Sequence, residues 1–588
     1  MTGAIRFALM LPLMAFAACL ALAAPATAQA RETAPILQPG DGTPPQPLGP
    51  MPMAVGLAPL TDWSTEQPFI DVMKTARPWI GHLAGQWGGA DHDDLAQAGY
   101  LDENGWPLEI PPELGSIGTV LLTDMPEEAT SLAGRYVLRF EGDGIVEVGG
   151  RAQNVRYGNG EVRFDFSPGA GPVEVRIQRT DRKKTGDYVR NITVVKEDNL
   201  RIYEAGAVFN PDFLRVLEGF RVLRFMDWMQ TNDSEQAQWR DRPRVGDYTY
   251  ALRGVPVEVM LDLANLLGVD AWFNMPHLAD DDYLRRFATL VHDGLWRDLK
   301  AYAEFSNEVW NWQFAQAQWA ERMGQDRWGK EHGWMQYYAL RASEAAAIWS
   351  EVYGDDAEAR LVNVLSTQTG WLGLEADVLT PSRLMREAPD RAPIASHFDA
   401  YAITGYFGHA LGKASRAPLV RQWIGDSRAF AEETALLQGL EGAAREAYVA
   451  AHRHDVATAL AWAELRDGLS SEDPEGTLAH LLNTLFPYHA AVAKEHGLDL
   501  IMYEGGTHLL GQGEVMEDQD LTDFFIHLNY SEEMGMLYTE LINGWQTVGG
   551  RLFNVYDDVR RPGKWGSWGA LRHLSDDNPR WQAIRGFQ

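Results

Sequence analysis

The sequence predicts an α/β fold, a TIM (β/α)8 barrel with a small β-sandwich module inserted between barrel strands 1 and 2. Short apolar stretches alternate with helical stretches along most of the chain, which indicates a parallel sheet. Polar residues gather just after the predicted strands, as they do at the C-terminal face of a closed barrel. Between residues 101 and 205 the apolar period changes to two, which is typical of half-buried antiparallel strands.

Residues 1–30 are predicted to be a secretory signal peptide, because one arginine and an apolar run precede the small-residue cleavage site Ala28-Gln29-Ala30. We therefore expect a secreted or periplasmic protein. The only cysteine, Cys19, lies in this segment and offers a lipoprotein anchor as the less favoured alternative. A chain that begins at Arg31 contains no cysteine, so it forms no disulfide and has no thiol chemistry.

The chain carries 82 acidic and 51 basic residues, which gives a formal net charge of −31. A surface with this charge repels nucleic acid and anionic membranes, so we expect neither as a partner. No apolar run outside the signal peptide is long enough to span a membrane. Most of the 21 tryptophans are expected in the core, but their frequency favours a sugar site, since indole rings pack against the flat CH faces of pyranoses.

The segment before the module contains an arm and the first barrel strand. Residues 31–52 are rich in proline, glycine and glutamine without any period, which indicates a linker or a wrapped arm. Residues 53–100 contain the first barrel strand and its exit loop. An acidic cluster in this loop, at residues 91–94, has the residue types of a metal site, but its spacing matches no known ligand loop. A solvated turn is the preferred interpretation.

Residues 101–205 are predicted to form the β-sandwich. Apolar residues alternate with polar ones around Leu138, Phe164 and Val175, and glycine-rich turns separate these stretches. Such a module either binds sugar or forms a wall of the cleft. We favour the wall, because its aromatic residues alternate inward as in a core and no exposed aromatic stripe stands out.

The remaining chain, residues 206–588, supplies the other barrel strands and the helices between them. A helical insertion rich in alanine, glutamate and arginine is predicted near residues 412–475. No Gly-x-Gly-x-x-Gly and no P-loop follows a predicted strand, so we expect no nucleotide cofactor. The predicted helices lie at 257–267, 280–293, 334–353 and 478–496, and the predicted strands lie at 220–228, 269–277, 299–305, 360–365, 400–406, 498–504 and 551–556.

Two of the predicted strands end in a glutamate. One closes with the sequence SNEVWN, in which Asn307 precedes Glu308, and a later one closes with YEGG, which contains Glu504. Because the C-terminal ends of parallel strands meet at one face of a barrel, we expect Glu308 and Glu504 to form a carboxylate pair. The two motifs resemble those of the clan of retaining glycoside hydrolases built on (β/α)8 barrels, without indicating a numbered family. The resemblance implies that Glu308, on strand 4, is the acid/base and that Glu504, on strand 7, is the nucleophile.

The same resemblance implies further roles around this pair. Asn307 is expected to hydrogen-bond the 2-hydroxyl of the sugar, although a strand-end amide that caps a loop has the same pattern. Arg224, at the end of predicted strand 2, is expected to lie near Glu504 and to lower the pKa of its carboxyl. Glu308 must hold a proton near working pH, and the negative charge of Glu504 is expected to raise its pKa.

Candidate substrate-binding residues also follow other strands. Tyr406, at the end of strand 6, is expected from the resemblance to steady the nucleophile, with a buried core tyrosine as the equally weighted alternative. Either Trp565 or Trp568, in the GKWGSWG loop after strand 8, is expected to form the floor beneath the reacting sugar. His277, after strand 3, either contacts a sugar hydroxyl or, as is more common for a lone histidine, is structural.

These features predict a secreted retaining glycoside hydrolase that acts on a polysaccharide or an oligosaccharide. The alternative is a non-catalytic carbohydrate-binding protein on a similar barrel, which need not keep both carboxylates. A metal-dependent hydrolase is disfavoured, because the 15 histidines include no His-Glu-x-x-His motif, and we expect neither a metal nor a cofactor. Substrate specificity is expected to depend on the loops at the C-terminal face.

Overall fold

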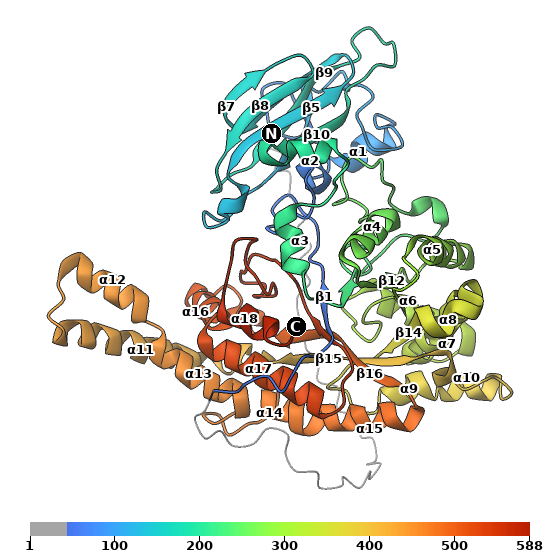
Figure 1. Cartoon of the computed structure of the whole chain (residues 1–588), viewed down its shortest axis with the longest axis vertical. Coiled ribbons are helices and arrows are strands. Elements are labelled where there is room, and N and C mark those ends of the chain that lie inside the picture. The colour runs from blue at the N-terminus through green and yellow to red at the C-terminus, as the bar shows by residue number, and fades with distance from the viewer. Residues whose placement is uncertain (1–43) are drawn as a thin grey trace, which may run out of the picture.

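In a computed structural model of the protein, residues 44–588 are described. The predicted signal peptide, Cys19 and most of the predicted arm lie outside the described residues. The structure consists of a closed barrel with its helices and a β-sandwich that lies at one end of it, at the top of Figure 1. None of the helices between residues 44 and 588 is long and apolar enough to cross a membrane.

Parallel strands close the barrel, and they follow one another around it in chain order. The last strand pairs with the first, so the sheet has no free edge. The predicted (β/α)8 class is thus confirmed. Most strand residues are buried, because helices cover the outside of the sheet and side chains fill its inside. The strands are β1 (Met53–Gly56), β11 (Val222–Arg224), β12 (Asp270–Met275), β13 (Ala301–Phe305), β14 (Leu361–Ser366), β15 (Ala400–Phe407), β16 (Asp499–Thr507) and β17 (Phe553–Val555).

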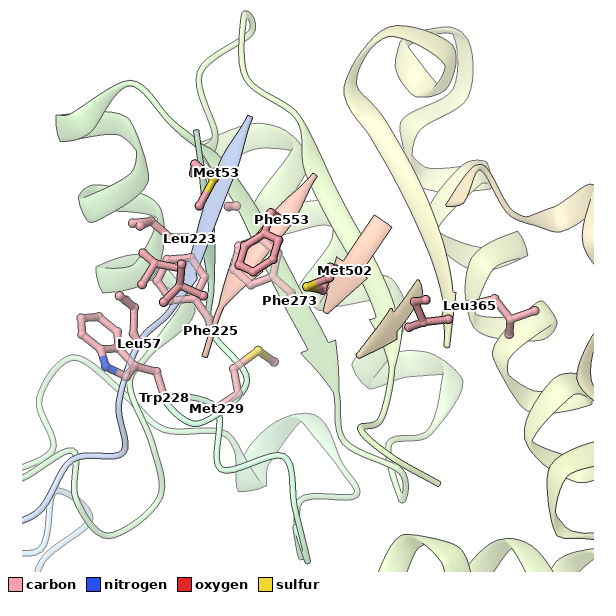
Figure 2. Packing of buried hydrophobic residues seen from close by; sticks show 14 of the residues in the cluster. Met53, Leu57, Leu223, Phe225, Trp228, Met229, Phe273, Leu365, Met502 and Phe553 are labelled. Atoms are coloured by element: carbon pink, nitrogen blue, oxygen red, sulfur yellow. The ribbon is translucent and has the colours of Figure 1, made fainter. Parts of the chain in front are cut away.

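Alternate residues of the barrel strands face the inside of the barrel and the surrounding helices. On β11, Val222 belongs to the interior cluster, whereas Leu223 belongs to the larger cluster between strands and helices. On β12, Trp272 and Phe273 divide in the same way. Figure 2 shows part of the larger cluster, including Leu223 and Phe273. The same alternation directs Arg224, two residues after Val222, to the inside of the barrel.

The helices around the barrel follow the predicted order. α4 (Val257–Leu267) and α7 (Trp334–Tyr353) have the predicted limits, and both limits of α5 (Asp281–Gly294) lie within one residue of the prediction. α4 starts after Pro256, whose φ of −61° suits a helix start, and ends at Gly268 in the left-handed conformation. The predicted helix 478–496 consists of α14 (Leu478–His480), the π-helical turn η8 (Leu481–Leu485) and α15 (Phe486–His496).

The inserted module is a sandwich of two antiparallel sheets. Apolar side chains of β8 (Glu161–Phe166) and β9 (Val173–Thr180) alternate into the core between the sheets. Two strands that precede residue 101 join the five-stranded sheet, so this sheet reaches further toward the N-terminus than the predicted boundary. These two strands, β2 (Ile80–His82) and β3 (Gly89–Ala90), have three and two residues. Strands this short show no apolar periodicity, so the sequence did not reveal them. The other strands are β4 (Ser116–Leu121), β5 (Gly134–Glu141), β6 (Gly144–Gly150), β7 (Gln153–Tyr157) and β10 (Arg190–Lys196).

The acidic cluster at residues 91–94 is the start of a helix, α1 (His92–Gln97), and not a solvated turn. The Asp94 backbone N–H donates to the Asp91 carboxylate (2.9 Å), and the Asp91 N–H donates to the Asp94 carboxylate (3.1 Å). This capping box accounts for the acidic residues, because it satisfies N–H groups that the first helical turn leaves free. Within residues 44–588, no group of three or more His, Cys, Asp or Glu side chains is arranged to hold a metal ion.

Two further segments lie outside the strands and helices of the barrel repeat. α11 (Ala417–Leu437) and α12 (Gly442–His452) project from the barrel as a helical hairpin, in orange at the lower left of Figure 1. Part of the predicted arm lies along α17 (Glu532–Thr547): the Leu48 N–H donates to Asn543 Oδ1 (2.9 Å). With α13 (Asp455–Asp467), the hairpin forms the helical insertion between β15 and β16.

Candidate active site

Five of the predicted residues meet at the C-terminal ends of β11, β13, β15 and β16. The guanidinium of Arg224 donates to Glu504 Oε1 (2.9 Å) and to Asn307 Oδ1 (2.8 Å). The Tyr406 hydroxyl donates to the other carboxylate oxygen of Glu504 (3.0 Å). Glu308 follows Asn307 in the chain, and the negative charge of Glu504 acts on its carboxyl. Both oxygens of Glu504 are thus held by donors that favour its ionised form.

A β-bulge in β16 brings two consecutive side chains to the inside of the barrel. Thr404 on β15 pairs with Glu504, where an unbroken register would pair it with Tyr503. Tyr503 belongs to the interior cluster, and its hydroxyl donates to Glu308 Oε1 (3.3 Å). In a regular strand, consecutive residues would face opposite sides of the sheet. The bulge therefore allows Tyr503 and Glu504 to reach the same site.

Glu308 is held by two hydrogen bonds in an unusual stretch of backbone. Asn311 Nδ2 donates to Glu308 Oε2 (3.0 Å), and the Tyr503 hydroxyl donates to Oε1. Ser306 and Glu308 have positive φ angles, 64° and 42°, on either side of Asn307. Left-handed conformations of such residues cost free energy and cluster at functional sites, where the surrounding structure holds them in place.

The two carboxyls differ in their electrostatic environment. Burial, followed by the negative charge of Glu504, raises the pKa of Glu308 to about 8. Burial also raises the pKa of Glu504, but the Arg224 guanidinium and the Tyr406 hydroxyl act against this rise. Glu308 therefore keeps its proton near neutral pH, whereas Glu504 has the partners that stabilise a carboxylate. When a neutral carboxylic acid lies beside an ionised carboxylate, the acid can protonate one atom of a ligand while the carboxylate attacks another atom of the same ligand.

A third carboxylate, not predicted from the sequence, shares Arg224. Glu304, on β13, has a fully buried side chain and accepts a hydrogen bond from Arg224 Nη2 (3.2 Å). Trp272 Nε1 (3.0 Å) and Asn274 Nδ2 (2.6 Å) donate to the same oxygen. A lone acidic residue in the otherwise apolar stretch 301–305 is the signal that could have revealed it, because a buried charge requires a partner.

Replacing Arg224 by methionine is expected to destabilise the fold strongly. Arg224→Met leaves Glu304 and Glu504 buried without their counter-charge, which typically costs about 3–5 kcal/mol. Urea titration measures this change in the free energy of unfolding. Arg421→Met is the matched control, because Arg421 is half exposed where it pairs with Asp518 and should contribute little. Equal losses in the two variants would contradict the inferred role of Arg224.

The amide of Asn307 is fixed by residues from two other segments. Its Nδ2 donates to Asn232 Oδ1 (3.1 Å), in the loop after β11. Gln316, on α6 (Ala315–Trp328), donates to the same Asn232 oxygen (2.8 Å) and to the Asn307 carbonyl (2.8 Å). Because Nδ2 carries two hydrogens, one remains for a ligand. The contact of Asn307 with a sugar hydroxyl stays a prediction. Its hydrogen bonds hold the Asn307 amide in a fixed position from which it can donate.

Of the two candidate tryptophans, Trp568 joins the cluster. Its ring lies 5.9 Å from that of Tyr406, 5.6 Å from that of Tyr556 and 5.1 Å from that of His508, measured between centroids. Trp565 is 56% exposed, and its backbone carbonyl accepts a hydrogen bond from Trp568 Nε1 (2.8 Å). Trp568 is therefore the better candidate for the floor under a sugar ring, and Trp565 supports its loop.

His277 lies apart from this cluster. Its buried ring packs edge-on against Trp319 of α6, with 5.4 Å between the centroids. Burial lowers the pKa of His277 to about 4, so the ring is neutral near pH 7. These contacts favour the structural interpretation of His277. The histidine that contacts Trp568 is His508, which follows β16 and was not predicted.

A second group of buried carboxyls lies on the loops after β1, β11 and β17, and none of them was predicted. Asp558 accepts a hydrogen bond from the Ala58 N–H (3.1 Å), and burial raises its pKa to about 7. Burial and the charge of Asp557 raise the pKa of Asp227 to about 8. Burial and the charge of Asp558 raise the pKa of Glu66 well above its usual range. These groups retain protons at a pH where exposed carboxyls have lost them.

We expect the melting temperature to fall as the pH rises from about 6.5 to about 8. The pKa values of Asp227, Asp558 and Glu308 are higher in the folded protein than in the unfolded chain, so the folded protein binds more protons. Its free energy of unfolding therefore decreases with pH in this window. Buried histidines such as His277 have lowered pKa values, so their titration changes the free energy of unfolding only below about pH 6.5. Scanning fluorimetry measures the slope, which Asp558→Asn should flatten; a rising melting temperature would contradict the prediction.

The sequence matches no family model and no curated protein. Solved structures that match it include a fungal β-1,4-galactanase, 11% identical, with 60% of this chain and 85% of that chain covered and a TM-score of 0.29. A β-glucosidase from Thermotoga maritima is also 11% identical, with 69% of this chain and 90% of that chain covered and a TM-score of 0.30. The barrel class rests on the order and closure of the sheet, and not on these likenesses.

Proposed function

We propose that the protein is a secreted retaining glycoside hydrolase that cleaves a polysaccharide or an oligosaccharide by double displacement. The observation that carries the proposal is the pairing of two unlike carboxyls. Glu308 has a pKa raised to about 8, and Glu504 has both oxygens held by Arg224 and Tyr406. Retaining cleavage requires one carboxyl that gives a proton and one carboxylate that attacks.

In the first step, the Glu504 carboxylate attacks the anomeric carbon while Glu308 donates its proton to the glycosidic oxygen. The bond between the anomeric carbon and this oxygen breaks, and an ester forms between the sugar and Glu504. The ester carries no negative charge, so the pKa of Glu308 falls and its carboxylate accepts a proton from water. That water attacks the anomeric carbon and releases Glu504 as a carboxylate.

Incubation with a panel of plant, algal and bacterial polysaccharides tests the proposed function. Mass spectrometry identifies the released oligosaccharides, and proton NMR at early times shows which anomer forms first. Retention requires the first anomer to keep the configuration of the cleaved bond. Binding of a polysaccharide with no new reducing ends would favour the alternative, a non-catalytic carbohydrate-binding protein.

We also propose that the protein is exported by means of the signal peptide at residues 1–30. The support is the small-residue site Ala28-Gln29-Ala30 after an apolar run. The N-terminal mass of the exported protein is expected to be that of a chain beginning at Arg31. A lipid-modified chain beginning at Cys19 would instead identify a lipoprotein.

A further inference from the structure

A cavity of about 510 Å³ adjoins the carboxylate pair. Its walls come from the loops after β13, β14 and β15 and from the segment that leads into α15. In the closed barrel, these three strands lie opposite β17, β1 and β11, whose ends and loops carry Trp568 and Arg224. The cavity is also lined by Tyr406, whose ring lies 5.9 Å from that of Trp568, so the cavity and the Trp568 side of the site meet at Tyr406. Its volume lies in the range of sites that enclose a small ligand.

The cavity contacts the residues that hold Glu308. Asn311 lines it and donates to Glu308 Oε2 (3.0 Å). Trp310 also lines it, and its Nε1 donates to the Tyr503 hydroxyl (3.2 Å), which contacts the other oxygen of Glu308. In the proposed reaction, the leaving group must lie beside Glu308, because Glu308 protonates the oxygen that leaves. The cavity thus occupies the place of a leaving group.

Two half-exposed tryptophans form one side of this cavity. Trp312 is 45% exposed and Trp371 is 50% exposed. Both rings contact the buried ring of Trp334, at 5.2 and 5.9 Å between centroids. The buried indole holds the two exposed indoles in place, so they present a rigid apolar surface to the cavity. Flat CH faces of sugar rings are suited to such a surface.

Another part of the cavity lining comes from a segment that is distant in the chain. The Gly408 N–H donates to the Gly476 carbonyl (2.8 Å), which ties this segment to the end of β15. Gly476 has a φ of 77°, and a Cβ there would lie 2.6 Å from the His409 ring, so only glycine permits this close approach. The π-helical turn η8 supplies Leu481 and Leu485 to the lining. π-Helical turns are rare and occur frequently at functional sites.

The charge of the lining disfavours acidic ligands. Among the described residues, the lining contains one carboxylate, Glu475, two histidines, His409 and His480, and neither lysine nor arginine. Burial lowers the pKa of His409, so its ring adds no positive charge near neutral pH. A uronic acid or a sulfated sugar would meet a carboxylate and no lysine or arginine in this lining, which is unfavourable.

We propose that this cavity is the leaving-group site and that it binds a neutral oligosaccharide segment stacked on Trp312 and Trp371. The proposal rests on the proposed function and specifies its substrate class. The substrate is then a neutral glycan that continues beyond the cleaved bond, and not the glycoside of a small alcohol.

The test compares a substrate that fills the cavity with one that does not. β-Linked tetrasaccharides of glucose, galactose, mannose and xylose fill it, whereas β-glycosyl fluorides of the same sugars have a single-atom leaving group. For Trp312→Ala and Trp371→Ala, we expect kcat/KM to fall about tenfold for the accepted tetrasaccharide and less than about twofold for the fluoride. Trp296→Ala is the matched control, because Trp296 is 59% exposed and precedes β13 at the opposite end of the barrel.

Selective loss of tetrasaccharide hydrolysis supports the proposal. It is overturned if both variants hydrolyse the tetrasaccharide at the unchanged rate, or if fluoride hydrolysis falls by the same factor. Fluoride hydrolysis by the unaltered protein keeps the proposed function in place in either case. No hydrolysis of any fluoride or tetrasaccharide by the unaltered protein would overturn both proposals together.

A binding measurement tests whether the cavity prefers a neutral ligand to an acidic one. Glu308→Gln is titrated calorimetrically with the accepted tetrasaccharide and with the same tetrasaccharide carrying a uronic acid at its reducing end. We expect the acidic ligand to bind at least about tenfold more weakly near neutral pH, and Glu475→Gln in this background should narrow the difference. Equal binding of the two ligands, or tighter binding of the acidic one, would overturn the proposal that the cavity binds a neutral oligosaccharide.

Discussion

Glu504→Ala is expected to lower the rate of hydrolysis by about 10⁴-fold or more, because it removes the carboxylate that forms the covalent bond to the sugar. The fold should survive, since Arg224 keeps its ion pair with Glu304. Added azide can occupy the vacated space and attack the anomeric carbon of a β-glycosyl fluoride. The resulting glycosyl azide is expected to have the inverted, α configuration, which proton NMR identifies.

Asp499→Ala is the control for this variant, because Asp499 is exposed at the other end of the same strand, β16. It is expected to leave the rate unchanged. A β-glycosyl azide from Glu504→Ala would exchange the roles of Glu504 and Glu308. Full activity of Glu504→Ala on a substrate that the unaltered protein cleaves would end the glycosidase proposal.

Glu308→Ala is expected to slow hydrolysis of oligosaccharides by about 10²–10⁴-fold, because their leaving groups require a proton. Dinitrophenyl glycosides and glycosyl fluorides have leaving groups that depart without one, so they should still form the glycosyl-enzyme. Azide should enter beside the missing carboxylate and yield a β-glycosyl azide, with retained configuration. Steady-state kinetics on the two kinds of substrate, with product NMR, measure the difference.

The pH profile gives a second test of Glu308. Because the pKa of Glu308 is raised to about 8, the protonated form required for the first step is lost as the pH rises through that value. The unaltered protein should therefore lose kcat/KM for oligosaccharides on the alkaline side. Glu308→Gln cannot titrate, so its residual activity on dinitrophenyl glycosides should lack this alkaline limb. If the activity of Glu308→Gln still decreases on the alkaline side as in the unaltered protein, the group that titrates there is not Glu308.

The sequence by itself determined the class of the fold and indicated that Glu308 and Glu504 lie at the same face of the barrel. Largely apolar stretches such as 301–305 and 500–503 indicate burial, because a strand covered on both sides excludes most polar side chains. The point where polarity returns marks the end of the strand, and in a parallel barrel such ends converge. Asn307, Glu308 and Glu504 were predicted for this reason, and the site brings them to Arg224 and Tyr406.

Only the tertiary structure decided which neighbours complete the site. Arg224 and Glu304 are 80 residues apart in the chain, and no local pattern indicates that they share a salt bridge. The bulge at Tyr503 changes the direction of a side chain through pairing with β15, which the sequence of β16 does not reveal. The selection of Trp568 over Trp565 depends in the same way on contacts with other loops.

The part of the cavity lining at Gly476 is a further example, since Gly476 meets His409 only after the helical insertion has folded back onto β15. Periodicity and strand-end chemistry are properties of neighbouring residues, so one chain is enough to show them. Register, bulges and contacts between loops depend on how segments distant in sequence pack against one another.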